Sequence, residues 1–328
     1  MSLLRDGFGR VHTNLRISVT DRCNIRCFYC MPEENVRFRP QAEILTFEEI
    51  ERFTRVAVQL GITKLRLTGG EPLVRRGLPE LVSRLAALPG VEDLALTTNG
   101  ILLREQAPDL KRAGLHRLNI SLDALTESVF EQIARRPGLD KVLDGIGAAI
   151  EAGFDRIRLN AVSIRGITES EIVPLAQFAR QHGLELRFIE YMPLDAQHAW
   201  ERQKVVPAAR ILAAIDAVHP LVPEGHVNEP ATTFRFADGA PGRVGVIASV
   251  TEPFCDTCNR LRLTAEGMFR NCLFAMGETD LRAPMRGGAS DDDLALLIRQ
   301  GLWAKWSGHR INHPDFVQPA RSMSMIGG

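Results

Sequence analysis

Six times between residues 15 and 190, a short run of alternating apolar and polar residues is followed by a longer segment whose apolar residues have helical spacing. The expected strands are residues 15–20, 63–68, 93–98, 117–122, 156–162 and 184–190, and the expected helices include residues 47–60 and 141–152. Crossovers between parallel strands are right-handed, so six consecutive units form a doubly wound sheet or a barrel. No GxGxxG turn follows the first strand, which argues against a dinucleotide-binding fold.

Residues at the ends of these segments agree with the pattern. Thr46 and Thr168 each precede a carboxylate by three residues, as a capping box requires. Glycines stand a few residues before four expected strands, where a helix would end in a left-handed cap, at Gly61, Gly114, Gly153 and Gly183.

The two faces of the expected strands differ in polarity, because alternate residues point to opposite sides of a sheet. One set is apolar and is expected to meet the helices, as in Leu15, Ile17 and Val19. The other set is Arg16, Ser18, Thr20, Arg66, Thr68, Asn119, Ser121, Asp123, Arg158 and Asn160. A closed eight-stranded barrel is filled mainly by branched apolar side chains. We therefore predict an open, partial barrel whose interior holds a polar ligand, with arginines that suit phosphate or carboxylate oxygens.

The length of 328 residues suits one barrel with a smaller partner. We expect a barrel domain over residues 1–215 and an α+β domain over residues 216–328 that covers the open side of the barrel. The second domain should hold strands at 244–250 and 261–264 and a helix at 291–306 with Ser290 as its cap. Lys plus Arg equals Asp plus Glu at 40 each, so the charge balance does not favour nucleic acid. No stretch approaches the roughly 18 apolar residues of a membrane helix, and we expect a cytoplasmic protein without membrane contact.

All six cysteines fall into two groups of three: Cys23, Cys27 and Cys30, then Cys255, Cys258 and Cys272. Disulfide frameworks belong to small secreted scaffolds, so metal ligation is the better interpretation. Three thiolates are one short of the four ligands of a closed zinc or iron–sulfur site, which leaves a coordination position open for chemistry. Two structural zinc sites, each completed by a histidine or an acid, are the alternative.

Further candidate residues lie at the carboxyl ends of the expected strands, where barrel enzymes carry their working residues. The sequence there reads Gly69-Gly70-Glu71-Pro72, Thr97-Thr98-Asn99-Gly100, Ser121-Leu122-Asp123 and Glu190-Tyr191-Met192-Pro193. The glycine pair permits close backbone approach, and Glu71 offers a carboxylate to an ammonium group. Because the first cysteine group also follows a strand, we expect it to meet these motifs at one rim.

The spacing CxxxCxxC after a first strand, with an aromatic before the third cysteine and GGEP after the second strand, resembles the radical S-adenosylmethionine superfamily. The resemblance implies a partial (βα)6 barrel of the TIM type in which Cys23, Cys27 and Cys30 hold a 4Fe–4S cluster. It also implies that the fourth iron binds S-adenosylmethionine and that an electron from the cluster yields a 5′-deoxyadenosyl radical.

The second half of the chain narrows the resemblance. The run Phe254 to Thr264, Cys272 after a thirteen-residue gap, and the ending Ile326-Gly327-Gly328 resemble the GTP 3′,8-cyclase family over essentially the whole chain. This implies a second 4Fe–4S cluster on the later cysteines, whose open iron meets the guanine base of GTP. In that family the radical removes hydrogen from ribose C3′, and the C3′ radical attacks guanine C8. The product is (8S)-3′,8-cyclo-7,8-dihydroguanosine 5′-triphosphate, and the reaction is the first step of molybdenum cofactor biosynthesis.

The resemblance also assigns roles to single residues. Contacts to S-adenosylmethionine are implied for Tyr29, Gly70, Glu71, Thr97, Ser121 and Met192. Contacts to GTP are implied for Arg16, Arg66, Arg158, Arg260 and Arg262. The family usually has lysine in place of Arg158, so a planar fork replaces a point charge there. Gly327 and Gly328 are implied to enter the active site and take part in starting the radical reaction.

The implied partners are GTP, a low-potential electron donor and, as the next enzyme, cyclic pyranopterin monophosphate synthase; a homodimer is a further expectation. Two other interpretations stay open from the residues alone. One is another radical enzyme with an auxiliary cluster, such as one that modifies peptides, although such enzymes usually carry more C-terminal cysteines. The other is a non-catalytic iron–sulfur or zinc protein, which would leave the arginine-lined interior unexplained.

Overall fold

The computed structural model describes residues 3–31, 34–195, 197–224 and 229–327. These residues form one sheet with the strand order β12-β11-β10-β1-β2-β3-β4-β5-β6-β9-β8-β7. The strands are β1 (Asn14–Ser18), β2 (Lys64–Thr68), β3 (Asp93–Thr98), β4 (Arg117–Ser121), β5 (Ile157–Ser163), β6 (Glu185–Glu190), β7 (Leu221–Pro223), β8 (Thr232–Phe236), β9 (Arg243–Ile247), β10 (Arg260–Leu263), β11 (Met268–Arg270) and β12 (Thr279–Asp280). The α-helices are α1 (Phe47–Gln59), α2 (Leu78–Ala86), α3 (Leu103–Arg112), α4 (Glu127–Ala134), α5 (Leu139–Glu151), α6 (Ile172–His182), α7 (Ala208–Asp216), α8 (Arg282–Arg286), α9 (Asp291–Trp303) and α10 (Met323–Ile326). Short 3-10 turns are η1 (Gln41–Glu43), η2 (Pro72–Val74), η3 (Glu169–Glu171), η4 (Arg202–Lys204) and η5 (Cys255–Thr257).

Strands β1 to β6 alternate with helices, and each is parallel to the next, as the sequence pattern predicts. The cap predictions at the four glycines are confirmed, since all four have a positive φ. Thr46 and Ser290 both form the predicted caps, in which the hydroxyl oxygen accepts a hydrogen bond from the third helical N–H. Local signals therefore define the ends of these elements well.

The capping box predicted at Thr168 is wrong. The Thr168 hydroxyl accepts a hydrogen bond from the Ile164 N–H at 2.7 Å, and it makes no cap bond at η3. Glu171, the expected second member of the box, accepts from the Leu125 N–H at 2.7 Å. The turn between residues 164 and 168 places the Ile164 N–H next to the Thr168 hydroxyl. The hydroxyl oxygen is therefore bonded within the loop and does not cap the helix.

Strands from the C-terminal segment join both edges of this sheet. β10 is parallel to β1, with Arg262 opposite Arg16, and β9 is parallel to β6. The described sheet thus has eight consecutive parallel strands, which are β10, β1 to β6 and β9, with the antiparallel pairs β11-β12 and β8-β7 outside them. The domain division at residue 215 stays a prediction, because the sheet continues across it.

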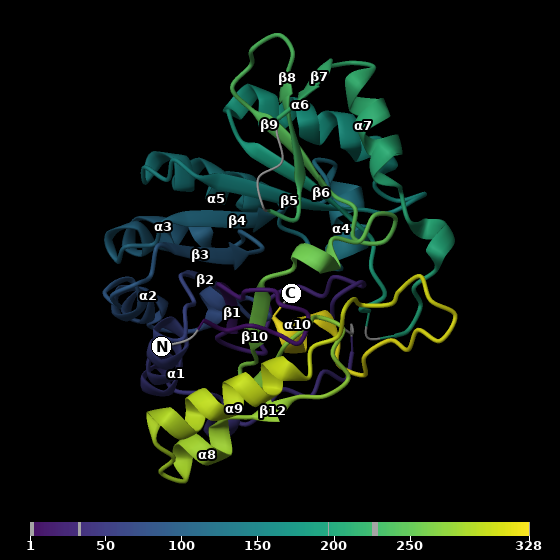
Figure 1. Ribbon diagram of the computed structural model, residues 1–328. Coiled ribbons are helices and arrows are strands. Elements are labelled where there is room, and N and C mark those ends of the chain that lie inside the picture. Colours follow the sequence, from purple (N-terminus) through teal and green to yellow (C-terminus); the bar gives the residue numbers. More distant parts are fainter. Residues whose placement is uncertain (1–2, 32–33, 196, 225–228, 328) are drawn as a thin grey trace.

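Helices cover the apolar face of the strands. Figure 1 shows α1, α2, α3 and α5 in succession along one side of the sheet, while α10 lies beside β10. The apolar set of strand residues is buried as predicted, with Ile17, Leu67 and Leu118 fully inaccessible. No helix in the described part of the chain is both long and apolar enough to cross a lipid bilayer.

Candidate active site

The two cysteine groups lie at opposite ends of strands β1 and β10. β1 leads into the loop of Cys23, Cys27 and Cys30, which we call the first triad. β10 begins directly after Cys255 and Cys258, which form the second triad together with Cys272. Because β1 and β10 are parallel, the first triad follows the carboxyl end of β1 and the second triad lies at the amino end of β10. At about 3.3 Å per residue, the two strand ends from which the triad loops extend are roughly 15 Å apart.

A cavity of about 110 Å³ lies beside the first triad. Its walls come from the loops after β1 to β4 and from α10, and are formed by Cys23, Ile25, Cys27, Tyr29, Cys30, Met31, Thr68, Gly69, Gly70, Glu71, Thr97, Thr98, Asn99, Ser121, Met323 and Ser324. A methyl group on Gly69 would lie 2.5 Å from the Thr20 carbonyl oxygen, and one on Gly70 would collide with the Arg22 carbonyl oxygen. The glycine pair therefore permits the close backbone approach that the sequence predicts.

The first triad has apolar and anionic surroundings. Burial raises the pKa of Cys23 to about 11, and Glu71 adds to the rise. Burial also raises the pKa of Cys27, with a contribution from Asp123, and it raises the pKa of Cys30 to about 12. None of these thiols is in a disulfide. A bound cation such as iron is therefore needed to hold all three as thiolates.

Both oxygens of Glu71 are engaged by the protein. They accept hydrogen bonds from the Leu73 N–H at 3.0 Å, the Asn99 N–H at 2.7 Å and the Thr98 hydroxyl at 2.7 Å. Burial nevertheless raises the pKa of Glu71 to about 7. Glu71 thus joins the ends of β2 and β3, and its contact with an ammonium group stays a prediction.

The Tyr29 hydroxyl is also engaged. It donates a hydrogen bond to Asp123 Oδ2 at 2.6 Å, while Asp123 Oδ1 accepts from the Val162 N–H at 2.8 Å. Burial raises the pKa of Asp123 to about 6 although these hydrogen bonds oppose it. The hydroxyl of Tyr29 is therefore occupied, and its aromatic ring is what it offers to the cavity.

The other predicted S-adenosylmethionine contacts divide into two groups. Gly70, Thr97 and Ser121 line the cavity, and Thr97 Oγ1 is buried without a hydrogen-bond partner in the described part of the chain. Met192 is not among the lining residues, and it packs instead against the apolar cluster that contains Ile326. The packing of the C-terminal segment decides the position of Met192.

One lining residue, Asn99, was not singled out by sequence reasoning. Its amide donates a hydrogen bond to Asn24 Oδ1 at 2.7 Å and lies 3.9 Å from Cys23 Sγ. The signal was present, because Asn99 lies in one of the predicted rim motifs. Met323 and Ser324 of the cavity wall carry no such signal.

The second triad has cationic surroundings. Arg260 Nη2 donates to Cys258 Sγ at 3.6 Å, and Lys305 Nζ lies 3.9 Å from the same sulfur. Burial raises the pKa of Cys258, but these two cations outweigh burial and lower it to about 6. Cys272 lines a separate cavity of about 290 Å³ between β11 and the end of α9. The two triads therefore share ligand type but differ in electrostatic environment.

Three of the predicted GTP contacts, Arg16, Arg66 and Arg262, are neighbours on the polar face of the sheet. Arg16 is opposite Arg66 on one side and opposite Arg262 on the other. Within the described residues, the Nε atoms of Arg16 and Arg66 are buried and have no hydrogen-bond partner. Burial, and then repulsion between neighbouring arginines, lowers the pKa of all three, that of Arg262 to about 9. Buried guanidinium groups with unused donors form a site for an anion.

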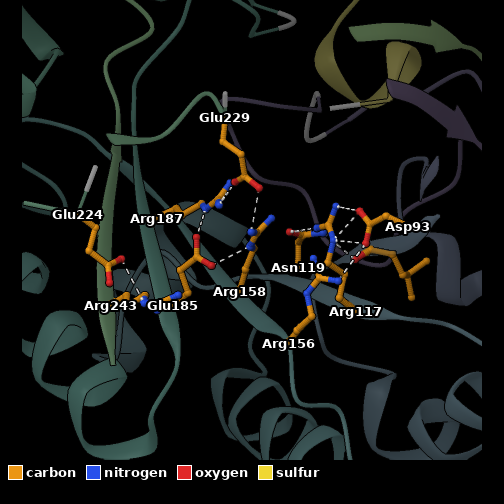
Figure 2. Close-up of polar contacts among 11 residues, drawn as sticks. Asp93, Arg117, Asn119, Arg156, Arg158, Glu185, Arg187, Glu224, Glu229 and Arg243 are labelled. Atoms are coloured by element: carbon orange, nitrogen blue, oxygen red, sulfur yellow. Dashed lines mark hydrogen bonds and ion pairs between the residues drawn. The ribbon is translucent and has the colours of Figure 1, made fainter. Parts of the chain in front are cut away.

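Arg158, another predicted GTP contact, is already paired. Its Nε donates to Glu185 at 2.8 Å and its Nη2 donates to Glu229 at 3.2 Å. Arg187 contacts the same two carboxylates, and Figure 2 shows the two arginines facing them from neighbouring strands. Any anion that reaches Arg158 must therefore compete with Glu185 and Glu229. The contact between Arg158 and GTP stays a prediction.

Gly327 lies on the polar face of β1 and β10. Arg262 Nη1 donates a hydrogen bond to the Gly327 carbonyl oxygen. Gly327 has a φ of +71°, and a methyl group there would lie 2.5 Å from Ser18 Oγ. Gly328 lies outside the described residues. Gly327 thus lies beside Arg262 of β10 and Ser18 at the end of β1.

The chemistry of these donors fits two 4Fe–4S clusters. Each triad consists of three free thiols, and the first adjoins a cavity with an unpartnered hydroxyl at Thr97. Among the described residues, no three or more His, Cys, Asp or Glu side chains are grouped to hold a single metal ion. In a 4Fe–4S cluster each thiolate binds a different iron, and three protein ligands leave one iron open for another ligand.

Comparison with known proteins connects this geometry with a family. Residues 17–179 match the radical SAM superfamily, and residues 184–311 match the family described as Molybdenum Cofactor Synthesis C. The GTP 3′,8-cyclase of Rhodopirellula baltica is 53% identical over 99% of this chain and 92% of its own length. The chain belongs to the GTP 3′,8-cyclase family. The GTP 3′,8-cyclase of Streptomyces coelicolor is 49% identical over 99% of this chain and 96% of its own length.

Solved structures with low sequence identity share the fold. SuiB of Streptococcus suis, in its structure bound to S-adenosylmethionine, has a TM-score of 0.64 and 15% identity over 95% of this chain and 76% of SuiB. This likeness confirms the predicted partial barrel with a C-terminal domain. At such identity it concerns the fold alone, so the peptide bound by SuiB in another structure says nothing about the substrate of this chain.

Proposed function

We propose that the chain is a radical S-adenosylmethionine enzyme that converts GTP to (8S)-3′,8-cyclo-7,8-dihydroguanosine 5′-triphosphate, the first step of molybdenum cofactor biosynthesis. One observation carries the proposal. Two triads of free cysteines lie at opposite ends of a strand pair whose polar face holds buried, partly unpartnered arginines. One triad alone would support radical chemistry on any substrate, whereas a second triad beyond an anion site supports a phosphorylated substrate between the two.

The first triad would hold one 4Fe–4S cluster and the second triad the other. When bound, the first cluster and S-adenosylmethionine supply the 5′-deoxyadenosyl radical that takes hydrogen from ribose C3′. Gly70 lets the backbone at Arg22 pack closely against the cavity wall, and Thr97 and Ser121 offer hydroxyl groups to S-adenosylmethionine. Asn99 and Asn24 orient the loop of the first triad through their mutual hydrogen bond.

The arginines bind and orient GTP. Arg16, Arg66 and Arg262 repel one another in a buried site, so an anion that accepts their hydrogen bonds relieves the repulsion. Arg260, which is close to Cys258, acts at the end of GTP that meets the second triad. Arg158 contributes when its carboxylate partners give way to the triphosphate. Gly327 and Gly328 complete the site from the C-terminus.

The same proposal includes the partners of the enzyme, its compartment, its oligomeric state and its domain boundary. A low-potential carrier donates the electron, and cyclic pyranopterin monophosphate synthase takes up the product. The protein acts in the cytoplasm and pairs into a homodimer. Its barrel domain ends near residue 215, and residues 216–328 carry the second triad and the tail.

The test is an anaerobic incubation of the reconstituted protein with dithionite, S-adenosylmethionine and one nucleoside triphosphate at a time. We expect 5′-deoxyadenosine and a cyclised nucleotide of unchanged mass with GTP alone. Deoxyadenosine without any nucleotide product, whichever nucleotide is present, would refute the substrate. A protein with both clusters intact that forms no deoxyadenosine would refute the radical reaction.

A further inference from the structure

Lys305 is a buried lysine beside the second triad. It follows α9, and only 5% of its surface is exposed. Its Nζ donates to the Arg260 carbonyl oxygen at 3.1 Å and to the Asn271 carbonyl oxygen at 2.5 Å, and it lies 3.9 Å from Cys258 Sγ. Three acceptors around one Nζ match the three N–H groups of an ammonium ion, and the neutral amine has only two.

The acceptors of Lys305 belong to both segments that carry the second triad. Arg260 is two residues after Cys258, and Asn271 directly precedes Cys272. The first segment leads into β10 and the second follows β11. One side chain, 45 and 34 residues away in sequence, therefore joins the two parts of the ligand set. A change at Lys305 would therefore alter the position of two ligands at once.

The charge of Lys305 has no carboxylate partner within the described residues. A buried ammonium group without a counter-charge is costly, because neutral carbonyl groups replace only part of its hydration. The Cys258 sulfur, 3.9 Å from Lys305 Nζ, can carry negative charge as a thiolate. The position of this lysine is thus stable only beside an anionic group, and a cluster on three thiolates is such a group.

A second cation, Arg10, contacts the backbone of Cys255, the third ligand of the triad. Its Nη1 donates to the Cys255 carbonyl oxygen at 2.7 Å and to the Ser307 carbonyl oxygen at 2.7 Å. Arg10 differs from Lys305 because it has a carboxylate of its own, Asp6, at 2.6 Å. Arg260 also lies beside the triad, since its Nη2 donates to Cys258 Sγ at 3.6 Å, but Lys305 is the cation that contacts both ligand segments.

We infer that Lys305 is a positioning residue for the second cluster: its ammonium group joins the two ligand segments and places a buried positive charge beside the cluster. This inference rests on the proposed function in so far as the second triad binds a 4Fe–4S cluster. One-electron reduction adds one negative charge to a cluster. A buried positive charge at contact distance favours the reduced form and raises the reduction potential.

The test is a redox titration of the holoenzyme, followed by the electron paramagnetic resonance signal of the second cluster and by iron and sulfide content. The signal is assigned with a variant whose first triad is replaced by alanine. We expect K305M and K305Q to retain both clusters and to show about a tenfold lower ratio of reduced to oxidised second cluster at a fixed potential. That ratio corresponds to about 59 mV for a one-electron couple. K305R, which keeps the charge, should stay near the wild-type potential.

The matched control is R310Q, which removes an exposed cation from the same C-terminal segment. Water screens this charge, so R310Q should leave the potential unchanged. Wild-type potentials in K305M and K305Q with full iron content would overturn the inference. Loss of the second cluster in all three Lys305 variants, K305R included, would overturn it as well, because packing and not charge would then be what the site needs.

Failure of the inference and failure of the proposed function are distinguishable. Wild-type protein that holds two clusters but forms no cyclised nucleotide would count against the function and leave the potentials measurable. Wild-type protein without iron at the second triad would count against both.

Discussion

The two cysteine triads differ in their surroundings far more than in their sequence. Around the first triad, burial and the carboxylates Glu71 and Asp123 oppose negative charge. In the second triad, the cations Arg260 and Lys305 favour negative charge on Cys258, although burial raises the pKa of Cys255. We therefore expect the first cluster to give up an electron more readily than the second. The comparison indicates that one ligand type can hold two clusters of different reduction potential, because the surrounding charges differ.

The largest effect should come from removing one ligand of each triad. Cys27→Ala should abolish formation of 5′-deoxyadenosine, because the first cluster is lost. Cys258→Ala should keep deoxyadenosine within about tenfold of wild type and lower the cyclised product by about a hundredfold or more. Both products are measured in the same anaerobic assay by mass spectrometry. Equal loss of deoxyadenosine in the two variants would break the distinction between the triads.

A second test concerns the tail that lies between the triads. In Gly327→Ala the new methyl group would lie 2.5 Å from Ser18 Oγ, on a backbone with a φ of +71°. The tail must shift, and we expect product formation to fall by about ten- to a hundredfold. The control is Gly147→Ala in α5, where a methyl group likewise meets no atom within 4 Å. Equal rates in the two variants would show that the tail has no role in the reaction.

A third test concerns Asp123, the buried carboxylate beside the first triad. Tyr29→Phe removes the hydroxyl that donates to Asp123 and leaves a buried carboxylate oxygen without a donor. We expect the free energy of unfolding to fall by about 1–3 kcal/mol, measured by anaerobic urea denaturation. Tyr191→Phe is the control from the same aromatic cluster, since the Tyr191 hydroxyl has no hydrogen bond within the described residues. A similar loss in both variants would show that the hydrogen bond to Asp123 is not the cause.

The smallest effect is a pH dependence near the second site. His12 is fully buried, and burial followed by repulsion from Lys305 lowers its pKa from 6.5 to about 4. The folded protein thus favours neutral His12, and the resulting stability is fully present above pH 6.5 and is lost as the pH falls toward 4. Between pH 7 and pH 5 this loss should be about 2 kcal/mol.

The measurement is the free energy of unfolding at both pH values for wild type and His12→Gln. The variant should lose less stability on acidification than wild type. His313→Gln, which changes an exposed histidine, should behave like wild type. A wild-type pH dependence in His12→Gln would show that His12 is not the group whose protonation destabilises the protein.

Much of the fold followed from local sequence signals. The six strands, the glycine caps and the Ser290 cap depend on residues within a few positions of one another, so a pattern predicts them. The packing of Met192 against the apolar cluster that contains Ile326 could not be predicted, because Ile326 comes from the other end of the chain. The pairing of Arg158 with Glu229 has the same origin, since 71 residues separate the two.

The sequence by itself determined the two cysteine triads, the polar face of the strands and the arginines on it, because spacing along the chain decides which side chains share a loop or a strand face. Only the tertiary structure decided that β10 pairs with β1 and that the triads lie at opposite ends of this pair. It also decided which charges surround each triad. Burial and charge act through space, and the residues that provide them, such as Lys305, are far from the cysteines in sequence.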